Sequence, residues 1–142
     1  GKWEAGESLL ECARRETKEE TGLMVDQLTC AAELRFVEEA GPQWLGYVFV
    51  AEHCSGELTQ TREAKPFWCD MNAIPYSSMW ADDAIWLPRV LEQARGQKPF
   101  AAPFVQDFLF NDGDLLAFEP AKQAELSFSV KQPRATQPSS RA

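Results

Sequence analysis

The sequence has only one histidine, His53, and its four cysteines form no CxxC pair. A tetrahedral zinc site needs several cysteine or histidine ligands at short spacings, so this composition argues against one. One or two disulfides are compatible with cysteines spread this widely, but reduced and partly buried thiols are the simpler interpretation. We therefore expect a cytoplasmic protein without structural zinc.

Long apolar runs and positive charge are also scarce. No apolar stretch approaches the roughly 18 residues that a membrane-spanning helix needs. Against 22 Asp and Glu residues the chain has only 14 Lys and Arg residues, which gives a net charge of -8. Nucleic-acid binders normally carry a basic stripe, so we expect neither nucleic acid nor a membrane as a partner. An acidic enzyme can still bind a polyphosphate through metal ions.

Hydrophobic residues are plentiful enough for one globular domain. They make up 44% of the 142 residues, and nine Phe and five Trp are among them. A chain of this length can bury a core of its own. Beyond Pro120 it becomes polar, so we predict a disordered tail over residues 121–142, with a short strand over residues 125–130 as an alternative for part of it.

Three acidic residues near the start of the chain share one face of a predicted helix. Glu16, Glu19 and Glu20 lie at i, i+3 and i+4, where like charges repel each other. A divalent cation would relieve this repulsion, and carboxylate oxygens suit Mg²⁺ or Mn²⁺. The alternative is an ordinary surface helix with solvated acids.

The residues around these acids predict a loop, a helix and a second loop. Ser8 followed by Glu11 is typical of a capping box, and Gly22 suits the left-handed end of a helix. Leu9, Leu10, Ala13 and Thr17 supply an apolar stripe. The whole stretch reads G-x5-E-x7-R-E-T-x-E-E-x-G-L.

This pattern resembles a complete Nudix box. The matching residues are Gly1, Glu7, Arg15, Glu16, Glu19, Glu20 and Gly22, with Thr17 and Leu23 at the two apolar positions. Thr17 is the weakest match, because a larger aliphatic residue is usual there. The resemblance implies a Nudix-type α/β/α sandwich of the α+β class, in which a mixed sheet lies between helices and the box helix carries Mg²⁺, with Mn²⁺ as the alternative.

The rest of the chain predicts strands and one more helix. We expect a hairpin of strands 29–37 and 44–52, a second helix over 77–95 that is most secure from Ala81, and a hairpin of strands 104–110 and 115–119 around an Asp-Gly turn. Short strands over 58–61 and 67–70 are also expected. A breaker-rich loop fills residues 96–103.

The second half of the chain indicates which group of Nudix enzymes it resembles. Met79, Trp80, Ala81, Asp82 and Asp83 are similar to a Met-Trp-Pro-Asp-Asp stretch in the oxidised purine nucleoside triphosphatases, although Ala81 departs from the proline. The similarity runs from Gly1 to about Glu119, so residues 1–120 are expected to form the Nudix hydrolase domain. Similar enzymes have further strands before the box, and we expect this chain to be a fragment that lacks them.

A base-binding role fits the residue types in this stretch. Trp80 offers a large face for stacking on a base, and Asp82 and Asp83 offer hydrogen-bond acceptors to a purine edge. Two adjacent carboxyl groups in an apolar pocket would raise the pKa of one of them, which could then donate as well. The alternative is that Asp82 caps the second helix while Trp80 and Trp86 fill the core. Trp44 and Phe36 are weaker candidates for the pocket, and core packing is the better interpretation for them.

The resemblance also assigns roles at the box. Glu16, Glu19 and Glu20 are the expected metal ligands, and Glu20 is the expected residue to orient or deprotonate water. Arg15 would orient a neighbouring glutamate through a bidentate contact, while Glu7 would hold the loop to the helix. Glu63 matches a further metal ligand from a facing loop, or is a solvated loop residue.

The predicted activity is hydrolysis of an oxidised purine nucleoside triphosphate, such as 8-oxo-dGTP, to the monophosphate and pyrophosphate. Two alternatives stay open: a Nudix hydrolase of another nucleoside diphosphate-linked substrate, such as an ADP-sugar or a dinucleotide, and an inactive fragment that binds nucleotide. The expected partner is a small nucleotide, bound by a monomer.

Overall fold

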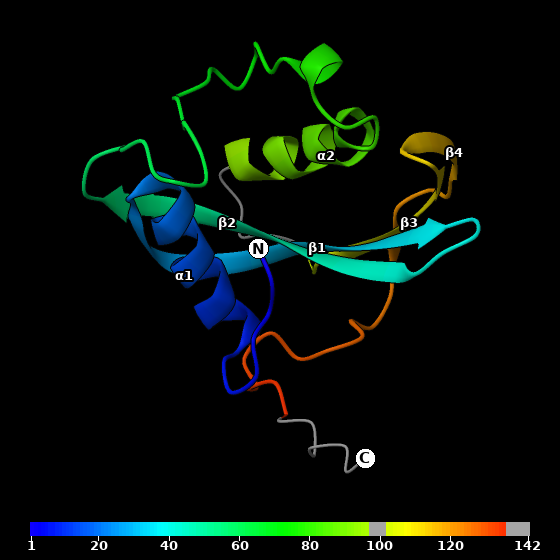
Figure 1. Cartoon of the computed structure of the whole chain (residues 1–142), viewed down its shortest axis with the longest axis horizontal. Coiled ribbons are helices and arrows are strands. Elements are labelled where there is room, and N and C mark those ends of the chain that lie inside the picture. Colours follow the sequence, from blue (N-terminus) through cyan, green and yellow to red (C-terminus); the bar gives the residue numbers. More distant parts are fainter. Residues whose placement is uncertain (97–101, 136–142) are drawn as a thin grey trace. The chain divides into compact units, whose positions relative to one another are not determined.

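A computed structural model describes residues 1–96 and 102–135 of the chain. The elements in chain order are α1 (Leu9–Thr21), β1 (Met24–Glu38), β2 (Gln43–Ser55), a 3₁₀ turn η1 (Tyr76–Ser78), α2 (Asp83–Arg95), β3 (Phe104–Asn111), β4 (Asp114–Phe118) and β5 (Lys122–Gln123) (Figure 1). No helix within these residues is long and apolar enough to cross a membrane.

The chain divides into two compact units. The first consists of Gly1–Leu28, Ala51–Phe67 and Ser127–Ala142, and the second of Thr29–Val50 and Trp68–Leu126. The long strands β1 and β2 run through both units. Each unit has its own set of interactions.

The described strands form one mixed sheet with the order β2-β1-β3-β4, and β5 pairs with β3. β1 and β3 are parallel, with Ala32 opposite Phe104 and Glu38 opposite Phe110. β3 and β4 form the expected antiparallel hairpin. Its turn residues Asp112 and Gly113 have positive φ angles of 49° and 86°, which Asp and Gly tolerate better than most residues. The mixed sheet and two helices confirm the predicted α+β class.

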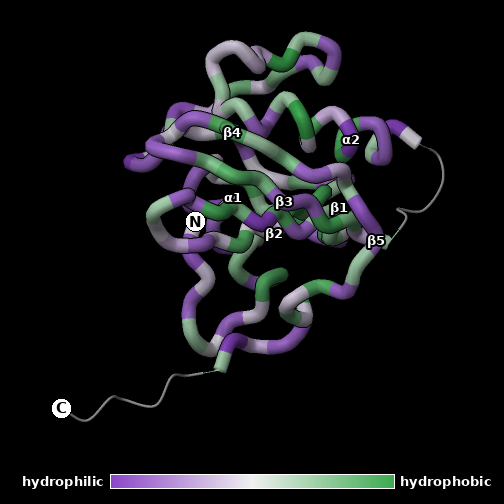
Figure 2. Tube along the Cα trace, turned by 90° about the vertical axis from the view of Figure 1, so that its right-hand side faces the viewer, coloured by the Kyte–Doolittle hydropathy of each residue, from purple (hydrophilic) through white to green (hydrophobic). Residues whose placement is uncertain are grey.

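The core of the second unit lies between α2 and one face of this sheet. Its buried residues are Ala31, Ala32, Leu34, Val90, Phe104, Phe108 and Phe110, and Ile85 and Trp86 of α2 pack against them. Phe36 stacks on Phe108 with ring centroids 5.6 Å apart. Figure 2 shows hydrophobic residues along the strands and α2, interspersed with hydrophilic ones. Burial of these large side chains stabilises the unit by roughly 1.5–3 kcal/mol for each of them.

The first unit contains α1, whose two ends follow the sequence prediction. The Ser8 hydroxyl accepts from the Glu11 N–H at 3.1 Å, and the Glu11 carboxylate accepts from the Ser8 N–H at 3.3 Å. Gly22 ends the helix with a φ of 79°, and a Cβ there would lie 3.1 Å from the Glu57 carbonyl oxygen. Both the backbone angle and the close approach therefore favour glycine at this position.

Several predicted boundaries are wrong. The short strands expected over 58–61 and 67–70 do not form, because these residues pair with no other strand; Trp68 is 72% exposed. The second helix begins at Asp83 instead of Ser77, since the preceding residues form η1 and Met79 is extended. β1 begins five residues earlier than expected, at Met24.

The C-terminal segment also differs in detail from the expectation. The strand expected over 125–130 is absent, and the two-residue β5 forms just before it, against β3. Residues 127–135, within the predicted disordered tail, are described and contact the first ten residues of the chain. Residues 136–142 of that tail and most of the predicted loop 96–103 lie outside the described residues.

Candidate active site

Three glutamates of the first unit come together at the C-terminal half of α1. Glu16 and Glu20 lie one helical turn apart, and Glu63 comes from the segment that follows β2. One carboxylate oxygen from each lies within 4.8 Å of the others, and Glu16 and Glu20 are half-buried. Loop hydrogen bonds position Glu63: the Thr61 hydroxyl accepts from the Glu63 N–H at 3.2 Å and donates to the Glu20 carbonyl at 3.5 Å.

This spacing fits a small divalent cation. Ligand oxygens on opposite sides of Mg²⁺ are about 4.2 Å apart, because each lies about 2.1 Å from the ion. Adjacent ligand oxygens are about 3 Å apart, so carboxylate oxygens within 4.8 Å of one another are close to both separations. Arg15 pairs with Glu16, and a divalent cation would compensate the remaining negative charge of the three carboxylates, so the donor set suits Mg²⁺ or Mn²⁺.

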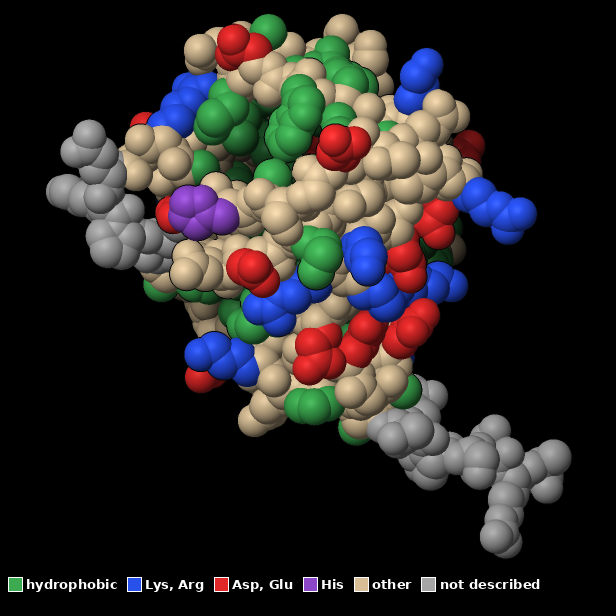
Figure 3. Space-filling view, turned by 90° about the vertical axis from the view of Figure 1, so that its left-hand side faces the viewer, with side chains coloured by type: hydrophobic (Ala, Val, Ile, Leu, Met, Phe, Trp, Pro, Cys, Tyr) green, Lys and Arg blue, Asp and Glu red, His purple; other side chains and the backbone are tan. Residues whose placement is uncertain are grey.

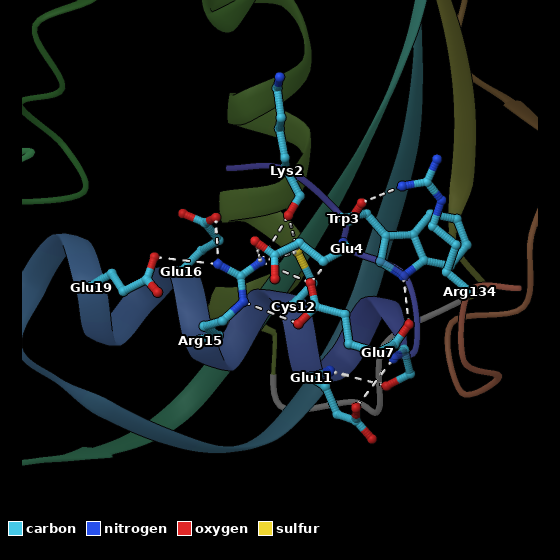
Figure 4. A network of polar contacts seen from close by, with 11 residues as sticks. Lys2, Trp3, Glu4, Glu7, Glu11, Cys12, Arg15, Glu16, Glu19 and Arg134 are labelled. Atoms are coloured by element: carbon cyan, nitrogen blue, oxygen red, sulfur yellow. Dashed lines mark hydrogen bonds and ion pairs between the residues drawn. The ribbon is translucent and has the colours of Figure 1, made fainter. Parts of the chain in front are cut away.

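Arg15 lies at the centre of a polar network beside the cluster (Figure 4). Its Nε and Nη2 donate to the two carboxylate oxygens of Glu7 at 3.0 and 2.8 Å. Nη1 donates to Glu16 at 2.9 Å and to Glu19 at 3.3 Å, and Nη2 also donates to the Lys2 carbonyl at 2.8 Å. The planar guanidinium therefore orients the Glu16 carboxylate while it is itself fixed by Glu7.

The network keeps its charges at neutral pH. Hydrogen bonds from Arg15 lower the pKa of Glu7 to about 2, although partial burial opposes this. The hydrogen bonds that Arg15 donates to Glu7, and then to Glu16, raise the pKa of Arg15 above its usual value. Burial raises the pKa of the neighbouring Cys12 thiol to about 11, so Cys12 stays neutral. Acidic and basic side chains also gather close together on one face of the molecule (Figure 3).

Glu19, which the box resemblance includes among the ligands, lies outside the group of three. Its carboxylate binds Arg15, and its side chain is 46% exposed. Gly1, by contrast, lies directly against Glu16, and a Cβ on Gly1 would collide with the Glu16 carboxyl group. The first glycine of the box thus makes room for one of the three clustered acids.

The second unit contains an apolar pocket of about 580 Å³ between the end of β1, the start of α2 and the β3–β4 turn. Its lining residues are Leu34, Phe36, Glu38, Trp44, Trp80, Asp82, Asp83, Trp86, Phe110 and Gly113. The Trp80 side chain is 67% exposed, so it does not fill the core. All three base-binding candidates, Trp80, Asp82 and Asp83, line this pocket.

The two aspartates differ in their surroundings. Asp82 is buried and accepts a hydrogen bond from the Trp86 indole N–H at 2.8 Å, while its side chain makes no capping hydrogen bond to α2. Burial, and then the charge of Asp82, raises the pKa of Asp83 above its usual range. This direction agrees with the expectation that one carboxyl of the pair would hold its proton more tightly.

Sequence reasoning missed several residues of this pocket. Trp44 is only a weaker pocket candidate from the sequence, with core packing preferred, but it is 53% exposed and lines the pocket. No sequence motif includes Glu38, yet its carboxylate accepts from the Asp112 N–H at 2.5 Å at the pocket's edge. The sequence signal that could have found Glu38 and Trp44 is their position at the two ends of one hairpin turn, where β1 ends and β2 begins. For Phe110 and Gly113, no sequence pattern distinguishes a residue that lines a pocket from an ordinary hairpin residue.

A mixed sheet, two helices and an acidic motif on the first helix place the chain in the α+β class that the Nudix box predicts. Residues 1–90 match the family model of the NUDIX domain. Since this is more than half of the chain, the chain belongs to the Nudix family, as the box predicted.

Relatives with curated names agree with this family. An oxidized purine nucleoside triphosphate hydrolase of Danio rerio is 38% identical over 96 residues, covering 67% of this chain and 62% of that protein. One of Mus musculus is 32% identical over 117 residues, covering 82% of this chain and 70% of that protein. An 8-oxo-dGDP phosphatase of Homo sapiens is 34% identical over 102 residues, covering 68% of this chain and 30% of that protein. The chain thus spans less than two thirds of the Danio rerio relative.

A solved structure supports the same fold. The crystal structure of a MutT protein from Bacillus halodurans matches with a TM-score of 0.72 and 29% identity, over 84% of this chain and 77% of that one. This likeness confirms the predicted Nudix-type fold.

Proposed function

We propose that the chain hydrolyses purine nucleoside triphosphates with an oxidised base, such as 8-oxo-dGTP, to the monophosphate and pyrophosphate. The observation that carries this proposal is the convergence of Glu16, Glu20 and Glu63 within 4.8 Å. Three carboxylates this close form a donor set for Mg²⁺ or Mn²⁺. A bound ion of this kind would neutralise the phosphate chain and polarise the attacking water.

In this proposal the acidic residues and Arg15 of the first unit have different roles. Glu16, Glu20 and Glu63 hold the ion, and the Glu20 carboxylate accepts the proton of the attacking water. Arg15 keeps Glu16 in its ligating orientation through the 2.9 Å hydrogen bond. Glu19 contributes to the site through its contact with Arg15, and it is the least favoured of the four expected metal ligands.

The pocket of the second unit supports an oxidised purine as the base. Its indole faces suit stacking, and it has carboxyl groups but no basic residue along its lining. Such a lining favours a base edge that is rich in N–H donors. A raised pKa favours the protonated form of Asp83, which can donate to a carbonyl oxygen, while Asp82 accepts from the Trp86 indole N–H.

A nucleoside diphosphate with the same base is a second candidate substrate. The names of several relatives, 8-oxo-dGDP phosphatases, favour it. We propose the small nucleotide as the partner and a monomer as the working state, without nucleic acid or membrane.

The experiment is a comparison of product release from 8-oxo-dGTP, 8-oxo-dGDP, dGTP, 2-hydroxy-dATP and ADP-ribose in the presence of Mg²⁺. We expect a preference for the oxidised purine triphosphates. Glu20→Gln should lower kcat by about 100-fold or more, while Glu57→Gln, at an exposed position in the first unit, should leave it unchanged. Preference for ADP-ribose, an unchanged kcat in Glu20→Gln, or binding without turnover would each overturn the proposal.

A further inference from the structure

The C-terminal residues 128–134, which we call the strap, lie along the loop that precedes α1 in the first unit. The Arg134 N–H donates to the Glu7 carbonyl at 2.8 Å, and the Arg134 carbonyl accepts from the Gly6 N–H at 2.9 Å. The Leu10 N–H donates to the Val130 carbonyl at 3.2 Å. These main-chain hydrogen bonds fasten the strap to both the box loop and the first turn of α1.

Two strap side chains enclose Trp3. The Arg134 guanidinium donates to the Trp3 carbonyl at 2.7 Å and lies over the indole ring, 5.7 Å from its centroid. The Phe128 ring meets the same indole edge-on at 5.3 Å. Cation–π and edge-on aromatic contacts both restrict the orientation of the indole. The strap therefore restricts the orientation of Trp3 from two sides.

Trp3 in turn contacts the residue that fixes Arg15. The Trp3 indole N–H donates to the Glu7 carbonyl at 2.7 Å, which is the same oxygen that accepts from Arg134. The Glu7 carboxylate then receives two hydrogen bonds from Arg15. Figure 4 shows this continuous series of contacts from Arg134 to the acids of α1.

We propose that Arg134 is a positioning residue for the metal-binding glutamates. Through Trp3 and Glu7 it holds the Arg15 guanidinium in the place from which Arg15 orients Glu16. This inference rests on the proposed metal site, but the contacts that carry it lie outside that site. A loop without such contacts would open locally, because short surface segments belong to the least stable parts of a protein.

Electrostatics alone predicts the opposite effect, which makes the proposal testable. Arg134→Ala removes a positive charge, so an effect of charge alone would strengthen the binding of a cation. If Arg134 acts through geometry, its removal weakens binding instead. Lys131→Ala is the matched control, because Lys131 is an exposed residue of the same strap and its substitution makes the same change in charge.

The measurement is the Kd for Mn²⁺, by calorimetric titration well below the unfolding temperature. We expect Arg134→Ala to raise this Kd roughly threefold to tenfold, near the lower end of what loss of an outer contact does to a metal site. Arg134→Lys should recover part of the affinity, since lysine can still donate to the Trp3 carbonyl. Lys131→Ala should leave the Kd unchanged or slightly lower. Equal Kd values for Arg134→Ala and Lys131→Ala would overturn the proposal.

A pair of truncations tests the strap as a whole and separates its failure from failure of the metal site. A chain ending at Leu126 lacks the strap, whereas a chain ending at Ala135 keeps it. Hydrogen exchange of the amides of residues 4–16 should be faster in the first chain and unchanged in the second, whether or not Mn²⁺ binds. If the untruncated chain binds no Mn²⁺, the proposed function fails. If exchange is the same in both truncated chains, the strap proposal fails.

Discussion

The Arg15 guanidinium and the Glu7 carboxylate form a two-point contact across eight residues of chain, with N–O distances of 3.0 and 2.8 Å. Only arginine presents two parallel donors in this way. Arg15→Lys should therefore lower the urea concentration at the midpoint of unfolding, because lysine cannot make both hydrogen bonds to the carboxylate. Urea denaturation measures this change. Arg14→Lys, at an exposed position on the same helix, should have no effect, and equal stability of both variants would contradict the prediction.

The same contact predicts how stability depends on pH. Glu7 has a pKa near 2 in the folded chain against an ordinary value of 4.5. A lowered pKa contributes stability that is fully present above the unfolded value and is lost as the pH falls through the folded value. The difference in unfolding free energy between the wild-type chain and Glu7→Gln should therefore be constant above about pH 5 and shrink as the pH falls towards 2. A difference that stays constant down to pH 2 would show that Glu7 does not titrate in this way.

Local rules were sufficient to predict the box helix and the β3–β4 hairpin. A capping box, a C-terminal glycine and an Asp-Gly turn each depend on a few neighbouring residues, and each forms as predicted. Local rules do not predict the parallel pairing of β1 with β3. It joins residues about 70 positions apart, such as Ala32 and Phe104, and no local pattern specifies such a partner.

The limits of local reasoning are clearest at the two candidate sites. Helical spacing predicts that Glu16 and Glu20 share a face, but Glu19 shares it too, and only the position of Glu63 on its loop shows which two acids join the cluster. The predicted disordered tail was likewise based on composition. Residues 127–135 are polar, but Phe128 and Arg134 contact Trp3, so a few well-placed side chains compensate for the lack of a hydrophobic run.

The position of Glu19 leads to a prediction about metal affinity. Because Glu19 binds Arg15 and lies outside the group of three, Glu19→Gln should raise the Kd for Mn²⁺ less than Glu63→Gln does. We expect a loss of roughly tenfold or more for Glu63→Gln and less than about threefold for Glu19→Gln, since removal of a direct ligand costs more than removal of an outer contact. Titration calorimetry measures the Kd for Mn²⁺ of both variants. A larger loss for Glu19→Gln would move Glu19 into the ligand set and Glu63 out of it.

The exposed indole of Trp80 gives the sharpest test of the pocket. Trp80 is 67% exposed, so Trp80→Leu should change the stability of the chain by less than about 0.5 kcal/mol. If a base stacks on this indole, the loss of stacking should weaken nucleotide binding by about 1–3 kcal/mol, which is roughly fivefold to 150-fold in Kd. Trp68→Leu is the control, because Trp68 is 72% exposed in the same unit and does not line the pocket. Binding of the 8-oxoguanine nucleoside, followed by tryptophan fluorescence, isolates the base from the phosphates. Equal affinities of the two variants would show that the base binds elsewhere.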